Sequence, residues 1–103
     1  ALTSPLRSPS LPDVPTFAYQ GYPDIVVQEW LGWFLPAKAP QEQVRKLNAL
    51  VREGLEDPAL IESLAKNGLQ PRHQAPDEFA QMVRADLARW APIVKASGFT
   101  AED

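Results

Sequence analysis

The chain has 103 residues, of which 45% are hydrophobic and 22% charged, as is typical of one small globular domain. Its net charge of −3 offers no basic surface to a nucleic-acid backbone or to an anionic membrane. Cysteine is absent, which excludes disulfides, thiolate nucleophiles and Cys-ligated metals. The longest apolar run is interrupted by Glu29, Gly32 and Pro36 and is too short to span a membrane.

Residues 1–25 are predicted to form an extended, proline-rich lead-in with little regular structure. Its prolines each remove a backbone donor and bias the preceding residue toward extended conformations: Pro5, Pro9, Pro12, Pro15 and Pro23. The segment is richer in apolar residues than a flexible linker, so we expect it to lie across a surface. Within it, Thr16 is predicted to cap a short helical turn over residues 17–20 that ends at Gly21.

Residues 26–36 form the densest apolar and aromatic run, with two of the three Trp and one of the four Phe. Such residues favour a strand. Alternation places Trp33 on one face, and Trp30 and Phe34 on the other with Gly32 between them. A strand that is apolar on both faces is typical of a sheet covered by helices on both sides. We therefore interpret Trp30, Gly32, Trp33 and Phe34 as structural residues of a covered strand.

Two helices are predicted to follow. The first begins with Pro40 at its first helical position, and its apolar stripe consists of Val44, Leu47, Val51 and Leu55, widened by Leu50. The second is capped by Asp57, continues with Pro58 and ends at Asn67 and Gly68. Residues 69–74 are predicted to be an extended link or an edge strand, because Pro71 excludes a central position in a sheet.

The last helix is predicted to begin at Pro76, with two acidic residues in its first turn, and to end at Gly98. Its apolar stripe consists of Phe79, Val83, Leu87, Trp90 and Val94. Pro92 lies inside this pattern and removes the amide that would bond to the Ala88 carbonyl. A kink or a local break is therefore expected there.

The sequence contains no enzyme or metal-site motif. His73 is the only histidine, with no second His or Cys to complete a metal site, and we interpret it as a surface residue beside Arg72. The glycines form no phosphate-binding loop, and no serine lies in a Gly-x-Ser-x-Gly motif. We therefore expect no catalytic residue, no metal and no cofactor. The aromatic residues of 26–36 could line a ligand cleft, but packing is the favoured interpretation.

Several short segments follow one another in a specific order and spacing along the whole chain. They are Thr3-Ser4-Pro5-Leu6-Arg7-Ser8, Leu11-Pro12-Asp13-Val14-Pro15-Thr16, Gly21-Tyr22-Pro23, Trp30-Leu31-Gly32, Phe34-Leu35-Pro36-Ala37, Lys46-Leu47-Asn48, Asp57-Pro58, Pro76-Asp77-Glu78-Phe79 and Trp90 to Gly98. Together they resemble the C-terminal third of the Bug (TctC-like) solute-binding receptors of tripartite tricarboxylate transporters.

The resemblance implies a helix-rich fragment of a periplasmic-binding-protein-like (type II) fold, an α/β class with a ligand cleft between two lobes. Three helices would pack on one or two short strands. Residues 1–25 would be the lead-in and interlobe segment, and residues 26–103 the crossing strand with the three-helix part of one lobe. The missing N-terminal part would carry a signal peptide and the loops that hold the ligand.

The resemblance also implies a function, which is capture of a small carboxylate in the periplasm and its delivery to a membrane permease. We expect Ser4 and Thr16 to contact the ligand, because a hydroxyl beside the crossing can donate to a carboxylate. Two positions depart from the family pattern. Tyr19 stands where Glu is usual, which puts a charge-dependent role of that loop in doubt. Ala39 stands where a Thr cap is usual, which predicts a frayed helix start.

An independent interaction module is the alternative interpretation, with the aromatic strand docking a partner by edge pairing or groove filling. A reading frame that starts near Ala1 would favour the module, and a long upstream coding region with a signal peptide would favour the receptor. As an isolated fragment, the chain is expected to cover Trp30, Trp33 and Phe34 by forming a homodimer.

Overall fold

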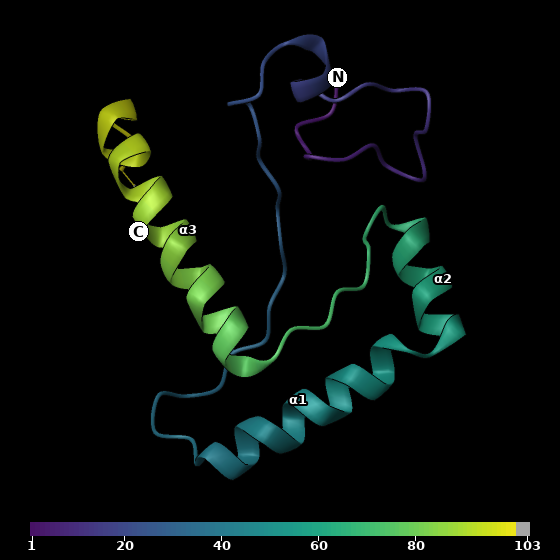
Figure 1. Cartoon of the computed structure of the whole chain (residues 1–103). Coiled ribbons are helices and arrows are strands. Elements are labelled where there is room, and N and C mark those ends of the chain that lie inside the picture. Colours follow the sequence, from purple (N-terminus) through teal and green to yellow (C-terminus); the bar gives the residue numbers. More distant parts are fainter. Residues whose placement is uncertain (101–103) are drawn as a thin grey trace. The chain divides into compact units, whose positions relative to one another are not determined.

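Residues 1–100, which the computed structural model describes, contain three α-helices and one 3-10 turn (Figure 1). The turn is η1 (Ala18–Gln20), and the helices are α1 (Gln41–Leu55), α2 (Pro58–Lys66) and α3 (Pro76–Ser97). Contacts along the chain divide it into two units, Ala1–Leu35 and Pro36–Asp103. The first unit contains η1, and the second contains all three α-helices.

The predicted strand over residues 26–36 does not form, and no other strand lies in the described part of the chain. One isolated parallel bridge joins Leu2 to Thr16, and the Val27 amide donates to the Thr3 carbonyl at 2.9 Å. A strand needs a neighbour that pairs with it along its length, and residues 1–100 supply no such ladder. The α/β detail of the expected fold is therefore not confirmed, and the link at residues 69–74 is not a strand either.

Helix α1 begins one residue later than predicted, at Gln41. Pro40 occupies the N-cap position, and its carbonyl accepts hydrogen bonds from the amides of Gln43 and Val44 at 2.9 and 3.3 Å. No side chain caps this end, because neither Ala39 nor Pro40 carries an acceptor. The predicted fraying of this start stays a prediction.

The predicted boundaries of α2 are confirmed. The Asp57 carboxylate accepts from the Ala59 amide at 2.8 Å and from the Leu60 amide at 3.4 Å, and Pro58 follows as the first helical residue. The helix ends where Gly68 adopts a left-handed φ of 71°. The amides of Gly68 and Leu69 then donate to the carbonyls of Ala65 and Leu64, which is the Schellman arrangement.

Helix α3 is continuous from Pro76 to Ser97, so of the two outcomes expected at Pro92 the local break is wrong, and the kink stays a prediction. Ala88 and Pro92 both lie in an exposed part of the helix, where water can bond to the carbonyl that Pro92 leaves without its helical partner. At the other end, the Glu78 carboxylate accepts from the Ala75 amide at 3.1 Å. Since Ala75 has no side-chain acceptor, only this half of a capping box forms. The predicted end at Gly98 is confirmed by its φ of 70°.

The helices of the second unit cover only part of their apolar surface. Helix α1 contacts both α2 and α3, and its four predicted stripe residues are half-buried. Leu50, which was predicted to widen the stripe, is 64% exposed. On α3, Phe79 and Val83 are half-buried, whereas Leu87 is 71% exposed. No apolar side chain of residues 1–100 is fully buried.

Candidate functional site

The candidate site lies in the first unit, where residues 2–3 tie three separate segments together. The Leu2 amide donates to the Pro15 carbonyl at 2.8 Å, and the Phe17 amide donates to the Leu2 carbonyl at 2.9 Å. The next residue, Thr3, accepts from the Val27 amide. These bonds hold Thr16 between two anchored neighbours. Thr16 is 4% exposed and is the only buried residue among residues 1–100.

The Thr16 hydroxyl bonds to the turn as predicted, but the turn spans Ala18–Gln20, one residue shorter than predicted, with Phe17 at its N-cap position. Thr16 Oγ1 accepts from the Tyr19 amide at 3.1 Å, and the Thr16 carbonyl accepts from the Gln20 amide at 3.2 Å. The turn ends at Gly21, whose φ of 93° is left-handed. The amides of Gly21 and Tyr22 donate to the carbonyls of Ala18 and Phe17, and so close the turn. The hydroxyl of the buried Thr16 therefore already has a structural role, which is to accept a hydrogen bond from the turn.

Ser4, the other predicted ligand-contacting residue, lies in the same unit and is half-buried. Its hydroxyl donates to the Leu6 carbonyl at 2.7 Å. A donor that is already used locally must exchange this bond to reach a ligand, and the buried Thr16 must also become accessible. The assignment of Ser4 and Thr16 to a ligand cleft stays a prediction.

Arg7 is a residue of this unit that the sequence interpretation passed over. Its Nη1 donates to the Pro12 carbonyl at 3.0 Å, and its guanidinium carbon lies 5.0 Å from the centroid of the Tyr19 ring. A guanidinium over an aromatic face is a cation–π contact. Arg7 is also the only Lys or Arg among residues 1–35, a signal that was readable in the sequence.

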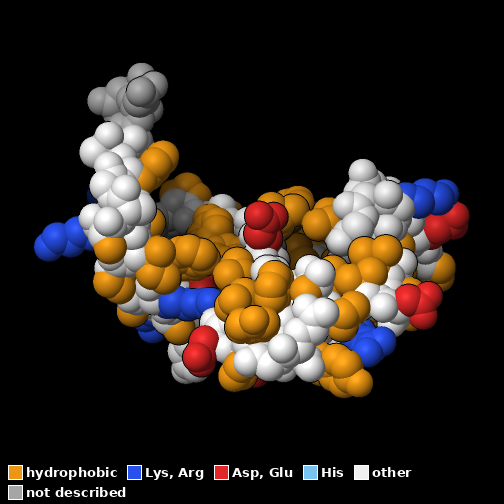
Figure 2. All heavy atoms as spheres, turned by 90° about the horizontal axis from the view of Figure 1, so that it is seen from above, with side chains coloured by type: hydrophobic (Ala, Val, Ile, Leu, Met, Phe, Trp, Pro, Cys, Tyr) orange, Lys and Arg blue, Asp and Glu red, His pale blue; other side chains and the backbone are white. Residues whose placement is uncertain are grey.

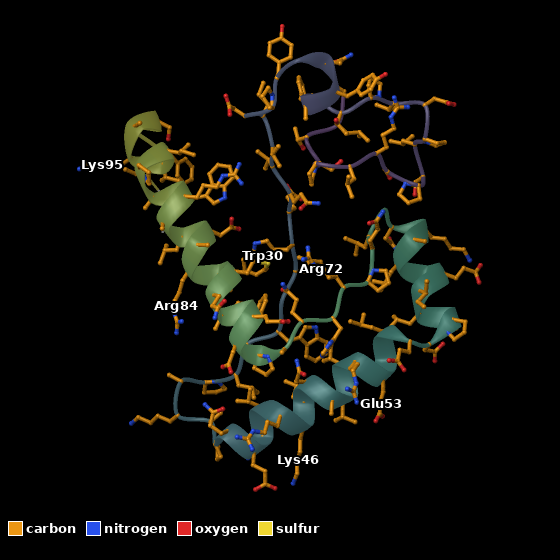
Figure 3. The ribbon with its side chains drawn as sticks, in the orientation of Figure 1. Trp30, Lys46, Glu53, Arg72, Arg84 and Lys95 are labelled. Atoms are coloured by element: carbon orange, nitrogen blue, oxygen red, sulfur yellow. The ribbon has the colours of Figure 1, made fainter. Side chains whose placement is uncertain are left out.

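The charge of Arg7 has no carboxylate partner in the described part of the chain. Ion pairs join Lys46 to Glu42 and Lys66 to Glu62, both at 2.8 Å on exposed helix surfaces. Figure 3 shows Lys46 and Glu53 projecting from the side of α1 that faces away from residues 69–75. Such exposed pairs contribute little to stability. The first unit thus carries one cation, which is oriented but not neutralised.

Of the predicted structural residues of 26–36, Trp33 and Phe34 are largely exposed. The Trp30 and Phe34 rings lie 6.4 Å apart between centroids, a distance typical of paired aromatic side chains. Trp33 is 73% exposed, and its neighbour Leu31 is 83% exposed. Gly32 is half-buried. The segment therefore exposes large apolar side chains that were interpreted as packing against other elements.

His73 lies on the surface, as predicted, but it has a partner in the second unit. Its Nε2 lies 3.0 Å from Oδ1 of Asn48, and Nδ2 of Asn48 donates to the Gln74 carbonyl at 2.9 Å. The described residues contain no group of three or more His, Asp or Glu able to hold a metal ion. In the same range, no helix is both long and apolar enough to cross a membrane.

Comparison with known proteins connects these residues to one family. The sequence profile of the tripartite tricarboxylate transporter family receptor, TctC, matches residues 1–99. Protein BugT of Bordetella pertussis is 32% identical over 98 residues, which are 95% of this chain and 30% of that protein. A UPF0065 protein encoded in the tcbD-tcbE intergenic region of a Pseudomonas species is 33% identical over 94 residues, or 90% of this chain and 28% of that protein.

An Agrobacterium vitis protein, the UPF0065 protein in the TAR-I ttuE-ttuC' intergenic region, is 31% identical over 101 residues. That alignment covers 95% of this chain and 29% of the relative. The chain therefore spans less than a third of the length of these curated relatives. No solved structure matches the chain.

Proposed function

The chain belongs to the tripartite tricarboxylate transporter receptor family, TctC, and from this membership we propose that it is part of a longer periplasmic solute-binding receptor. This longer protein, called the parent receptor below, captures a small carboxylate and delivers it to a membrane permease. It is a binding protein and not an enzyme. The chain forms its C-terminal part, and the signal peptide lies in the preceding part.

The observation that carries this proposal is the absence of any buried apolar side chain among residues 1–100. Figure 2 shows apolar side chains, coloured orange, open to the outside on the face in view. An independent domain needs a hydrophobic core that its own layers enclose. A segment of a larger domain instead buries its apolar surface against the rest of that domain. The exposed aromatic run at residues 26–36 fits the second case.

Each part of the chain has a proposed role in this larger domain. In the parent receptor, residues 26–36 pair as the crossing strand of an α/β sheet, and the upstream part supplies the neighbouring strands. Residues 1–25 lead into this crossing between the lobes, and the three helices cover one lobe. Ser4 and Thr16 lie beside the cleft and contact the ligand through their hydroxyl groups.

The test is ligand binding by the parent receptor, measured by isothermal titration calorimetry with lactate, succinate and citrate. Binding of at least one of these acids supports the proposal. A correctly folded parent receptor that binds none of them contradicts it. Alanine at Ser4 and at Thr16 is then expected to weaken binding, and unchanged affinity would remove both residues from the ligand site.

A second function, as a dimerising interaction module, is favoured by one observation. Trp33 and Leu31 are mostly exposed in the single chain, and large apolar side chains that are exposed together are often covered by a partner. As an isolated polypeptide, the chain covers these side chains with a second copy. Light scattering combined with fluorescence quenching separates the cases: a dimer with shielded tryptophans supports pairing, and a monomer contradicts it.

A further inference from the structure

We infer that Arg7, oriented by Tyr19 and by the Pro12 carbonyl, is the residue of the first unit that binds a carboxylate group of the ligand. This inference rests on the proposed function and adds a residue that was not among the predicted ligand contacts. The proposed interaction is a pair between the Arg7 guanidinium and the ionised carboxylate.

Arg7 is held at two points before any ligand arrives. One N–H donates to the Pro12 carbonyl at 3.0 Å, and the guanidinium carbon lies over the Tyr19 ring, 5.0 Å from its centroid. The backbone that carries this ring is held in the turn, because the Tyr19 amide donates to Oγ1 of the buried Thr16. A side chain that is already oriented loses less conformational entropy when it binds.

The guanidinium retains donors and charge for a ligand. It carries five N–H groups in a planar fork, and the structure assigns an acceptor to one nitrogen, Nη1. Among residues 1–100, no carboxylate lies within ion-pair distance of Arg7. The remaining N–H groups can therefore form the parallel pair of hydrogen bonds that a guanidinium makes with a carboxylate.

Arg7 is the one basic side chain of the first unit that could bind a ligand carboxylate, and it is accessible. Residues 1–35 contain one basic side chain against three acidic ones, Asp13, Asp24 and Glu29. A carboxylate that approaches this unit therefore meets favourable side-chain charge only at Arg7. Arg7 is exposed and Tyr19 is 75% exposed, so a ligand can reach both.

The experiment compares succinate with succinamide, its diamide, in the parent receptor and in Arg7→Gln. Loss of a charge-assisted pair of hydrogen bonds is expected to weaken succinate binding roughly 10- to 100-fold. Succinamide, which has no carboxylate, is expected to lose less, so the variant discriminates less between the two probes. Arg84→Gln is the matched control, because Arg84 is exposed on α3 and projects from that helix in the second unit (Figure 3).

The outcomes separate this inference from the proposed function. Weaker succinate binding with reduced discrimination supports a direct contact. An equal loss for both probes indicates that Arg7 only maintains the loop, and overturns the inference, as does unchanged binding. A parent receptor that binds succinate, lactate and citrate not at all overturns the proposed function and this inference together.

A second measurement keeps the test valid if Arg7→Gln does not fold. In the unaltered parent receptor, NMR signals of the Arg7 Nε–H group and of the Tyr19 ring are expected to shift when succinate is added. Absence of a shift at saturating succinate overturns the inference. Tyr19→Phe retains the aromatic face under Arg7 and is expected to bind succinate within about twofold of the unaltered protein.

Discussion

Asn48 on α1 fixes the ring orientation of His73, which lies 25 residues further along the chain. The Asn48 amide nitrogen must face the Gln74 carbonyl, because a carbonyl can only accept. Oδ1 of Asn48 therefore faces Nε2 of His73 at 3.0 Å and requires a hydrogen on that nitrogen. One side chain thus fastens the link between α2 and α3 to α1.

Asn48→Ala is expected to lower the free energy of unfolding of the parent receptor by about 1–3 kcal/mol, because two hydrogen bonds to the link are lost. Urea unfolding measures the change. Gln43→Ala, at an exposed position of the same helix, is the control and should stay within about 0.5 kcal/mol. Equal effects of the two variants would show that the link is held by other contacts.

Neutral His73 is expected to carry its proton on Nε2, since this tautomer donates to Asn48 and the other cannot. Nitrogen-15 chemical shifts of the imidazole ring report the tautomer directly. The imidazolium form also has a hydrogen on Nε2, so the contact is expected to persist when the ring is protonated. Observation of the Nδ1–H tautomer would contradict the assigned orientation of Asn48.

Asp57→Ala is expected to cost about 1 kcal/mol of stability, because the amides of Ala59 and Leu60 lose the acceptor that caps α2. Asp57→Asn retains a side-chain oxygen and should keep most of that stability. Chemical denaturation of both variants measures the difference. Equal losses would mean that the charge near the helix start matters, and not the capping oxygen.

Gly68→Ala is expected to destabilise by about 1–2 kcal/mol, because Gly68 has a φ of 71° that side chains with a Cβ resist. The control is Gly54→Ala in α1, where an added Cβ would lie 3.9 Å from Leu60 Cδ2, an ordinary contact. There, alanine is expected to stabilise by about 0.5–1 kcal/mol through its better helix propensity. Opposite signs for the two variants in thermal unfolding would confirm the assignment of the α2 end.

Pro92→Ala is expected to stabilise α3 by about 1–3 kcal/mol, because alanine restores the amide that can bond to the Ala88 carbonyl of a helix that is already continuous. Hydrogen exchange of residues 88–96 should slow as a result. Pro76→Ala is the control, since the first helical amide has no helical partner and little change is expected. Lower stability of Pro92→Ala would mean that the proline has a packing role in the parent receptor.

Elements with local causes could be predicted from the amino-acid sequence. The end of α2 follows from Gly68, the cap of α2 from Asp57 and the turn at residues 18–20 from Thr16 and Gly21. Each of these signals acts through hydrogen bonds and φ angles within about five residues, so no distant part of the chain can easily override it. The stripe of α1 was readable for the same reason, because its spacing matches one helix face.

The sequence could not predict which apolar or charged side chains find a partner, because partners come from segments that are distant along the chain. The apolar character of residues 26–36 was evident, but a strand forms only where a second strand lies alongside, and residues 1–100 contain none. Leu50 and Leu87 match helical spacing yet remain exposed, because burial depends on what faces a helix and not on its own sequence. Arg7 and Tyr19, and likewise Asn48 and His73, meet across intervals that no local pattern encodes. Hydrogen bonds within a few residues could therefore be predicted from the sequence. The pairing of strands and the burial of side chains could not, because they depend on contacts between segments that are distant along the chain.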